Sequence, residues 1–405
     1  MMLAKLKNLG PGLLFAGAAI GVSHLVQSTR AGADFGLGLL WALLLAHLFK
    51  YPFFQFGPRY ATATGESLLD GYKKLSKGIL ILYFVLNLAT IFTVQAGVTI
   101  VTAGLASNFF GDFINLKVWT IIIISTCLLL LVIGRYKLLD RLMKIIVITL
   151  TISTIVAVSI ALFNHTEPLS FKQVLPENPL DIAFLIAFMG WMPAPLDISV
   201  WHSLWTVEKN NDTKNYNTKS ALFDFNIGYI STIFLGTGFV LLGALVMFNS
   251  GETFSDSATV FSSQLIGMYT TNLGNWAYII IGLAAFTTMF STTLTTLDAS
   301  PRAMEKTTQL LFNKSTKLNY RFWIILLCMG TIGIFLFLAS EMGLLIKIAT
   351  ILSFITAPFY AIINYILISS KHTPKDCRPS KLMHIWCVLG IAFLAGFSFW
   401  YLSTL

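Results

Sequence analysis

The sequence predicts an all-α membrane protein with many spans. Of its 405 residues, 56% are hydrophobic and only 11% are charged, and the mean hydropathy is +0.76. Apolar windows longer than about 18 residues, enough to cross a bilayer as a helix, recur along almost the whole chain. No stretch is polar and long enough for a large soluble domain, so a single transmembrane domain over residues 1–405 is expected.

Apolar windows predict about eleven transmembrane helices. These spans are expected near residues 9–33, 37–57, 78–107, 118–134, 142–163, 180–206, 222–248, 274–298, 321–339, 343–369 and 382–404.

The net charge of +9 is explained by membrane topology. With the N-terminus placed in the cytoplasm, most of the 27 Lys and Arg residues fall at cytoplasmic ends of spans, and Lys117 and Lys172 fall at outer ends. This asymmetry predicts a cytoplasmic N-terminus and an extracytoplasmic C-terminus, in the plasma (inner) membrane. Because the positive charge is spread over loops in this way, a nucleic-acid partner is not expected.

The first span contains a polar interruption. Pro11 opens an apolar helix, as proline does at first helical positions. The apolar run then stops at Gly21-Val22-Ser23-His24, and polar side chains such as Gln27 follow. Because loosened backbone at that depth would be unsatisfied in lipid, we expect a discontinuous helix that lines a cavity.

The sixth span contains a matching interruption. An apolar helix over 181–189 is followed by Gly190-Trp191-Met192-Pro193-Ala194-Pro195, and Asp197 comes just after. Proline inside a helix removes backbone hydrogen bonds and clashes with the preceding turn, so this helix is expected to break or kink.

The two interruptions together predict the architecture. They lie five spans apart, and an odd number of spans reverses the orientation in the membrane, so the two halves are expected to be inverted repeats. Paired interrupted spans are typical of secondary transporters, which bind substrate near the midplane. We therefore expect a LeuT-like five-plus-five fold, with helices 1 and 6 broken. Repeat one covers about 9–163, repeat two about 180–369, and an extra helix about 382–404.

Several motifs along the chain match those of a known family. They are the GPG opening, AGADFGLGLLWALLLAHL after the first break, ATGESLLDG after the second span, Met192-Pro193, STTLTTLDASPRAME at 291–305, and Ala357-Pro358-Phe359. On these motifs the chain resembles the natural resistance-associated macrophage protein (NRAMP) family, proton-coupled importers of divalent metals. The resemblance implies the same fold, a divalent metal (Mn, Fe or Mg) as substrate, and a monomer.

The departures from the family pattern fall in the site itself. The family's Asp-Pro-Gly-Asn, whose aspartate and asparagine ligate metal, is replaced by Gly21-Val22-Ser23-His24, and its Met-Pro-His by Met192-Pro193-Ala194. The third span, which carries acidic residues for proton transfer in the family, has no Asp, Glu, Lys, Arg or His here. The chain thus resembles a divergent branch that lacks the usual metal-binding residues.

Two substrate classes fit the residues of the breaks. A transition metal would accept His24, Met192 and Asp197 as ligands. A small oxyanion such as bicarbonate would use the positive ends of the broken helices and hydrogen-bond donors near them. We favour the oxyanion because no acidic residue lies at the first break. The expected substrate site comprises Gly21, Ser23, His24, Gln27, Gly190, Met192, Ala194 and Asp197.

A coupling ion, Na⁺ or H⁺, is also expected, and no other cofactor. The predicted sodium ligands are a carbonyl near Ala19 and the hydroxyls of Ser291, Thr292 and Thr295. The alternative is that these hydroxyls only allow close helix packing. His24 and His202 are the candidate proton carriers.

Three charged residues inside spans have structural interpretations too. Lys50 is expected to extend toward the inner interface. Arg30 is expected to pair with Asp34 at the outer mouth. Asp197 is expected either to face the cavity or to cap the second half of the sixth span.

The predicted function is therefore secondary transport of a small ion across the membrane. A channel or a non-transporting receptor on the same scaffold is the alternative. No enzyme is expected, because no nucleophile, base and orienting group occur at useful spacing and H-E-x-x-H is absent. The four cysteines form no C-x-x-C pair, which disfavours a metal cluster.

Overall fold

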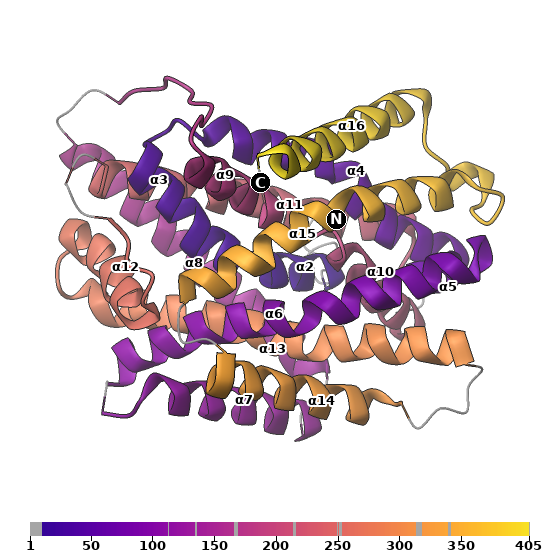
Figure 1. Ribbon diagram of the computed structural model, residues 1–405, viewed down its shortest axis with the longest axis horizontal. Helices are drawn as coiled ribbons and strands as arrows, with labels where there is room; N and C mark the ends of the chain where they lie inside the picture. Colours follow the sequence, from indigo (N-terminus) through magenta and orange to yellow (C-terminus); the bar gives the residue numbers. More distant parts are fainter. Residues whose placement is uncertain are drawn as a thin grey trace.

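The described part of the chain is a bundle of helices (Figure 1). The computed structural model describes residues 10–111, 113–133, 136–165, 169–213, 216–248, 250, 253–312, 318–338 and 342–404. Residues 1–9 and the basic turn at 134–135, which contribute to the predicted charge asymmetry, lie outside them. All regular elements in the described ranges are helical, which confirms the predicted fold class.

Each predicted span corresponds to one helix or to one interrupted pair. The helices of repeat one are α2 (Pro11–Ala19) with η1 (Ser23–Ser28) and α3 (Thr29–Phe35), α4 (Leu40–Thr64), α6 (Lys77–Phe110), α7 (Leu116–Ile133) and α8 (Tyr136–Asn164). Those of repeat two are α9 (Pro179–Trp191) with α10 (Ile198–Asp212), α11 (Thr218–Val246), α13 (Ala277–Phe312), α14 (Tyr320–Gly333) with η2 (Ile334–Leu338), and α15 (Met342–Ser369). The extra helix is α16 (Lys381–Ser403).

By length and apolarity, fewer of the described helices qualify as transmembrane spans than the eleven predicted. By these two criteria, seven described helices qualify as spans, and the bent pair at Pro11–Ala19 and Ser23–Phe35 makes up to eight. The total of eleven and the division into two repeats therefore stay predictions. Three short helices were not predicted: α5 (Leu68–Leu75), α12 (Ala258–Leu273) and η3 (Lys375–Cys377).

Both predicted interruptions are present. The first span bends by 46° after α2 and resumes as the π-helical turn η1. The sixth span stops at Trp191 and resumes at Ile198, so that Met192 to Asp197 are not helical. The breaks position the site because they place loosened backbone inside the bundle and not at its surface.

The first span packs against α11 with almost no space between the two backbones. A Cβ atom added at Gly12 would lie 2.2 Å from Asp224 O, and one at Gly228 would lie 2.1 Å from Gly12 O. The Asp224 carboxylate also accepts hydrogen bonds from Gly12 N at 2.9 Å and from Gly10 N at 3.2 Å. The GPG motif thus begins a helix whose backbone contacts α11 and whose first N–H groups are capped by Asp224 of α11.

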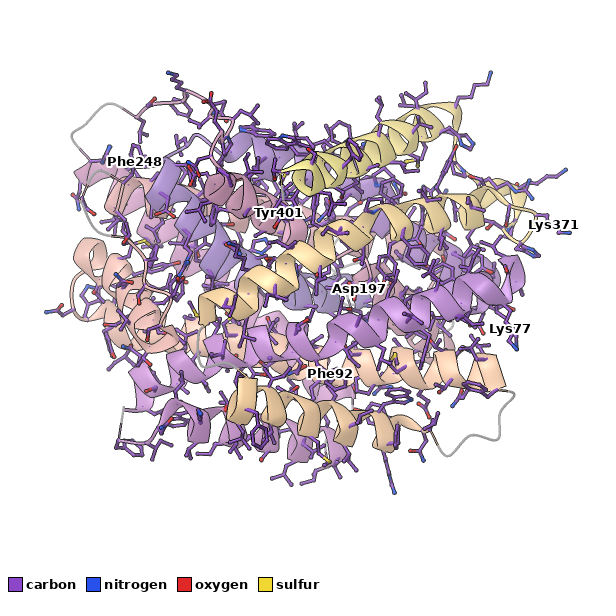
Figure 2. All side chains as sticks on the ribbon, in the orientation of Figure 1. Lys77, Phe92, Asp197, Phe248, Lys371 and Tyr401 are labelled. Atoms are coloured by element: carbon purple, nitrogen blue, oxygen red, sulfur yellow. The ribbon has the colours of Figure 1, made fainter. Side chains whose placement is uncertain are left out.

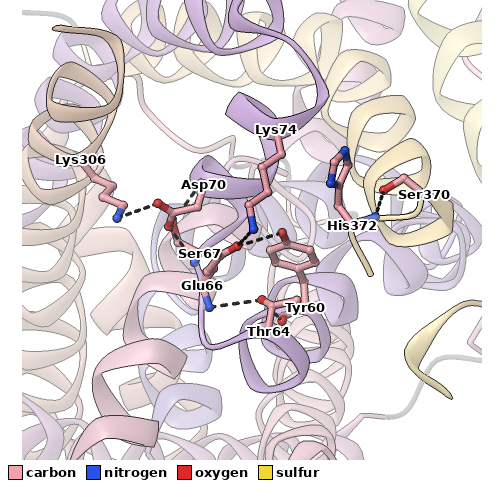
Figure 3. Close-up of polar contacts among 9 residues, drawn as sticks. All are labelled: Tyr60, Thr64, Glu66, Ser67, Asp70, Lys74, Lys306, Ser370 and His372. Carbon is pink, nitrogen blue, oxygen red and sulfur yellow. Dashed lines mark hydrogen bonds and ion pairs between the residues drawn. The ribbon is translucent and has the colours of Figure 1, made fainter. Parts of the chain in front are cut away.

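Two of the motifs that carry the family resemblance meet at one end of the bundle (Figure 3). In ATGESLLDG, Ser67 and Asp70 form a reciprocal capping box at the start of α5. Lys306, which directly follows the PRAME segment in α13, pairs with Asp70 at 2.8 Å. The same segment extends α13 through Pro301 to Phe312, well beyond the predicted end at residue 298.

We expect Gly228→Leu to destabilise the fold by about 3 kcal/mol, the upper end of the usual cost of overpacking, because the new side chain has to enter the backbone of α2. The measurement is the melting temperature of the purified protein in detergent. Gly396→Leu in α16 is the matched control, since nothing lies within 4 Å of a Cβ added there. Equal stability of the two variants would contradict the close α2–α11 contact.

Candidate functional site

The two breaks face a common cavity inside the bundle. The cavity has a volume of about 30 Å³ and is lined by residues of both breaks and of α6, α10 and α13. This is room for roughly two water-sized groups. Figure 2 shows Asp197, one of the lining residues, near the middle of the molecule and distant from the labelled helix ends at Lys77 and Lys371. The polar lining side chains are Ser23, Asp197, Thr292 and Thr296 and the indole of Trp201.

The first break is held by a serine and a histidine. Ser23 Oγ lies 2.7 Å from Ala19 O and 2.7 Å from His24 Nδ1. On the other side of its ring, His24 Nε2 lies 3.0 Å from Thr232 O of α11. The single proton of the Ser23 hydroxyl is directed at Ala19 O, and His24 Nδ1 lies 3.0 Å from the same oxygen. A proton on Nε2 of the imidazole would be donated to Thr232 O.

His24 is therefore turned toward α11. Its side chain is fully buried and is not among the residues that line the cavity, whereas its neighbour Ser23 is. The participation of His24 in substrate binding or proton transfer stays a prediction.

The second break is held by a lysine from α4. Lys50 Nζ donates to Met189 O at 2.7 Å and to Gly190 O at 2.8 Å, and lies 3.4 Å from Ala194 O. The lysine is fully buried, so the expectation that it extends to the membrane interface was wrong. The reason is that the end of α9 leaves carbonyl groups without intrahelical partners, and these solvate the ammonium inside the protein.

Asp197 faces the cavity at the start of α10. It lines the cavity and makes no side-chain capping hydrogen bond, which favours the first of the two roles predicted for it. It also interacts electrostatically with Lys50. Asp197 thus lines the cavity, whereas Lys50 binds the carbonyls of the second break without lining it, and Lys50 was not predicted as a site residue.

Trp201 is a second residue that the sequence did not point to. It lines the cavity, and its Nε1–H is buried without a hydrogen-bond partner among the described residues. An unpaired buried donor is costly unless something binds it. The sequence feature that could have indicated Trp201 is its position one helical turn after Asp197. Tryptophan is common in apolar helices, however, so this position alone did not predict a site residue.

Gln27 belongs to a second, larger cavity. This cavity has a volume of about 460 Å³, and its charged lining residues are Arg30, Asp256 and Lys347. Arg30 pairs with Asp256 at 3.0 Å, so the expected pair with Asp34 was wrong. Asp256 lies two residues before the start of α12, an element that the sequence analysis did not predict.

Of the remaining predicted substrate residues, three are packed against neighbouring residues and one lines the cavity. Gly21 lies against Thr292, whose side chain would be 2.8 Å from an added Cβ. Gly190 packs against the backbone of α15, with Thr350 O 2.3 Å from an added Cβ. Met192 is fully buried without lining the cavity, whereas Ala194 lines it.

The predicted sodium ligands lie near the end of α2. Thr292 Oγ1 is 3.1 Å from Gly17 O and 3.3 Å from Ile20 O, while the carbonyl of Ala19 is bound by Ser23. Thr295 Oγ1 is buried without a partner in the described part of the chain. Ser291 is buried on the same helix. A sodium site here stays a prediction.

His202 lies beside this region, in α10. It stacks on Phe15 and contacts Phe225, and neither of its ring nitrogens has a partner in the described ranges. No group of three or more His, Cys, Asp or Glu side chains within those ranges is placed to hold a metal ion. The four cysteines are free.

Two broken helices around a central polar cavity define a secondary transporter of the LeuT-like class. The chain matches the model of the natural resistance-associated macrophage protein-like (Nramp) family over residues 12–404. It is 34% identical to the uncharacterized protein PM0681 of Pasteurella multocida (strain Pm70), over 99% of this chain and 93% of that protein. The chain therefore belongs to the Nramp family, whose members are integral membrane transporters and not enzymes.

Other similarities agree with this assignment. The chain is 29% identical to the divalent metal cation transporter MntH of Staphylococcus aureus (strain MRSA252), over 60% of this chain and 56% of MntH. The manganese transporter of Eremococcus coleocola has a similar structure, with a TM-score of 0.75 at 12% identity, over 96% of this chain and 84% of that one. MhsT in complex with L-phenylalanine gives a TM-score of 0.63 at 14% identity, over 96% and 98% of the two chains. These structures confirm the predicted LeuT-like fold.

We expect Ser23→Ala to impair transport without loss of the folded protein, because this hydroxyl joins Ala19 and His24 at the cavity. Thr307→Ala is the matched control and should have little effect, since Thr307 is a buried threonine of α13 that bonds to Ala303 O of its own helix and does not line the cavity. The measurement is the initial rate of uptake into proteoliposomes, with monodispersity as the test of folding. Unimpaired uptake by Ser23→Ala would contradict the assignment of the first break to the substrate site.

Proposed function

We propose that the chain is a secondary transporter of a small oxyanion that carries one proton, such as bicarbonate. The observation that supports this most is that Trp201, whose Nε1–H has no partner in the described part of the chain, lines the same cavity as Asp197. The site thus offers both a donor and an acceptor. Bicarbonate has oxygens that accept from Trp201 and a hydroxyl that donates to Asp197, whereas a halide has no proton for the carboxylate.

The charges around the two cavities also favour an anion. Lys50 offsets the negative charge of Asp197, so the central site has no excess negative charge for a divalent cation. In the larger cavity, the charges of Arg30 and Lys347 exceed that of Asp256. A positive potential in such a cavity raises the local concentration of anions.

Import of a divalent metal cation (Mn, Fe or Mg) is the second candidate. It is supported by membership of the Nramp family and by the similarity to MntH. Asp197 supplies one carboxylate, and Mg²⁺ often binds through one or two carboxylates while it keeps several waters. Of the other ligands considered for a metal, His24 and Met192 would have to turn toward the cavity when the breaks rearrange.

Several further properties belong to the same proposal. Transport is coupled to Na⁺ or H⁺, with Ala19, Ser291, Thr292 and Thr295 as the sodium ligands. The protein acts as a monomer in the plasma (inner) membrane, with its N-terminus in the cytoplasm and its C-terminus outside. Saturable, concentrative uptake distinguishes this proposal from a channel or a receptor.

We expect wild-type proteoliposomes to become alkaline inside when bicarbonate is added, and not to accumulate manganese. The measurement compares an interior pH dye with a metal-sensitive dye, each with and without a sodium gradient. Protein-free liposomes are the control for leakage of CO₂ and bicarbonate. Manganese uptake without bicarbonate-dependent alkalinisation would contradict the oxyanion and establish the second candidate.

We expect Trp201→Phe to raise the KM for bicarbonate by roughly two- to tenfold, the equivalent of one lost hydrogen bond, with little change in maximal rate. Trp323→Phe is the matched control, because Trp323 Nε1 is also buried without a partner in the described ranges, but Trp323 does not line the cavity. The measurement is the concentration dependence of initial uptake. The same KM in both variants would exclude Trp201 as a substrate ligand.

A further inference from the structure

We infer that Lys50 is a tethered cation: its ammonium occupies the place where the carbonyls of the second break would bind a free cation, and it thereby excludes metal ions from this break. The inference rests on the chain being an ion transporter but does not depend on bicarbonate as the substrate. It assigns to Lys50 a role in determining the specificity of the site.

The carbonyls of Met189, Gly190 and Ala194 converge on one point. Two of them lie 2.7 and 2.8 Å from Lys50 Nζ, and the third lies 3.4 Å away. Met189 and Gly190 belong to the last turn of α9, where carbonyl groups lack the usual i+4 partner and the helix dipole is negative, and Met189 O accepts a cap bond from Met192 N at 3.4 Å. Carbonyl oxygens gathered in this way are typical ligands of hard cations.

The ammonium matches this set of oxygens. A lysine has three N–H donors and no acceptor, so three carbonyls use all of its hydrogen-bonding capacity. Lys50 is fully buried, and an ionisable residue at such a depth in a membrane protein marks a functional site with a specific partner. Here the partners are backbone atoms, which cannot be lost by substitution of another side chain.

The position of these carbonyls is fixed by packing. Gly190 is in contact with the backbone of α15, where Thr350 O leaves no room for a Cβ. The carbonyls therefore stay in place when the lysine is removed. The titratable groups that interact with Lys50 are Asp197 in α10 and His47 in α4. Without the ammonium, the carbonyls and Asp197 would form a set of acceptors that attracts a free cation.

The test measures whether metal ions stabilise the protein once Lys50 is changed. Lys50→Met and Lys50→Gln are purified as full-length chains in detergent. Their melting temperatures are followed as MgCl₂, MnCl₂ or NaCl is added, with choline chloride to match ionic strength. Lys347→Met, which removes an exposed lysine from α15, is the matched control.

We expect both Lys50 variants to melt below the wild type and to recover with a saturable rise in melting temperature as one of the metal ions is added. Binding to the folded state alone produces such a rise. The wild type and Lys347→Met should not respond more than they do to choline chloride. If Lys50→Met does not fold, Lys50→Gln carries the test, because it keeps a polar side chain at this position but removes the positive charge.

Lys50 variants that respond to metal ions no more than the wild type would overturn the inference. This result is separable from the proposed function. Bicarbonate transport by the wild type together with unresponsive Lys50 variants would reject the tethered cation alone. Stabilisation of the variants by metal, with no bicarbonate transport by the wild type, would support the tethered cation and reject the proposed function.

Discussion

The structure depends on how it satisfies the backbone of two helices that stop inside the bundle. In an apolar environment an unpaired carbonyl is costly, and neither lipid nor bulk water is available to bind it there. Each break is therefore supplied with its own donor: Ser23 and Thr292 at the end of α2, and Lys50 at the end of α9. Because these donors come partly from other helices, the breaks are linked to the rest of the fold.

This requirement explains the close packing of the first span. A short interrupted helix cannot keep its place by its own length, and α2 has only 9 residues. Backbone contact with α11 at Gly12 and Gly228, together with capping by Asp224, gives it a fixed position. The bond from His24 to Thr232 does the same on the other side of the break. The first break is thus anchored to α11 on the side away from the lining residues of the cavity.

The second break is linked to the end of the bundle through α10. Arg302 of α13 pairs with Asp298 at 2.7 Å and lies 3.8 Å from Glu208 near the end of α10. On the same helix, Lys306 pairs with Asp70 of α5. The family motifs outside the cavity therefore form a polar network around the long helix that also contributes Thr292 and Thr296 to the site. The same helix, α13, therefore contacts both the breaks and this end of the bundle.

The sequence by itself determined that this is a helical membrane protein with two interrupted spans, because apolar length and the Gly and Pro residues at the breaks are local properties. It also determined that the usual acidic ligands are missing at Gly21 to His24. Only the tertiary structure decided which groups the charged residues bind. From the sequence, Lys50 was predicted to extend to the membrane interface, but the packing of α4 against α9 places it on the carbonyls of Met189 and Gly190. Arg30 was predicted to pair with Asp34, but the fold places Asp256 beside it. Hydrogen bonds and ion pairs between distant segments depend on packing, and no local pattern encodes them.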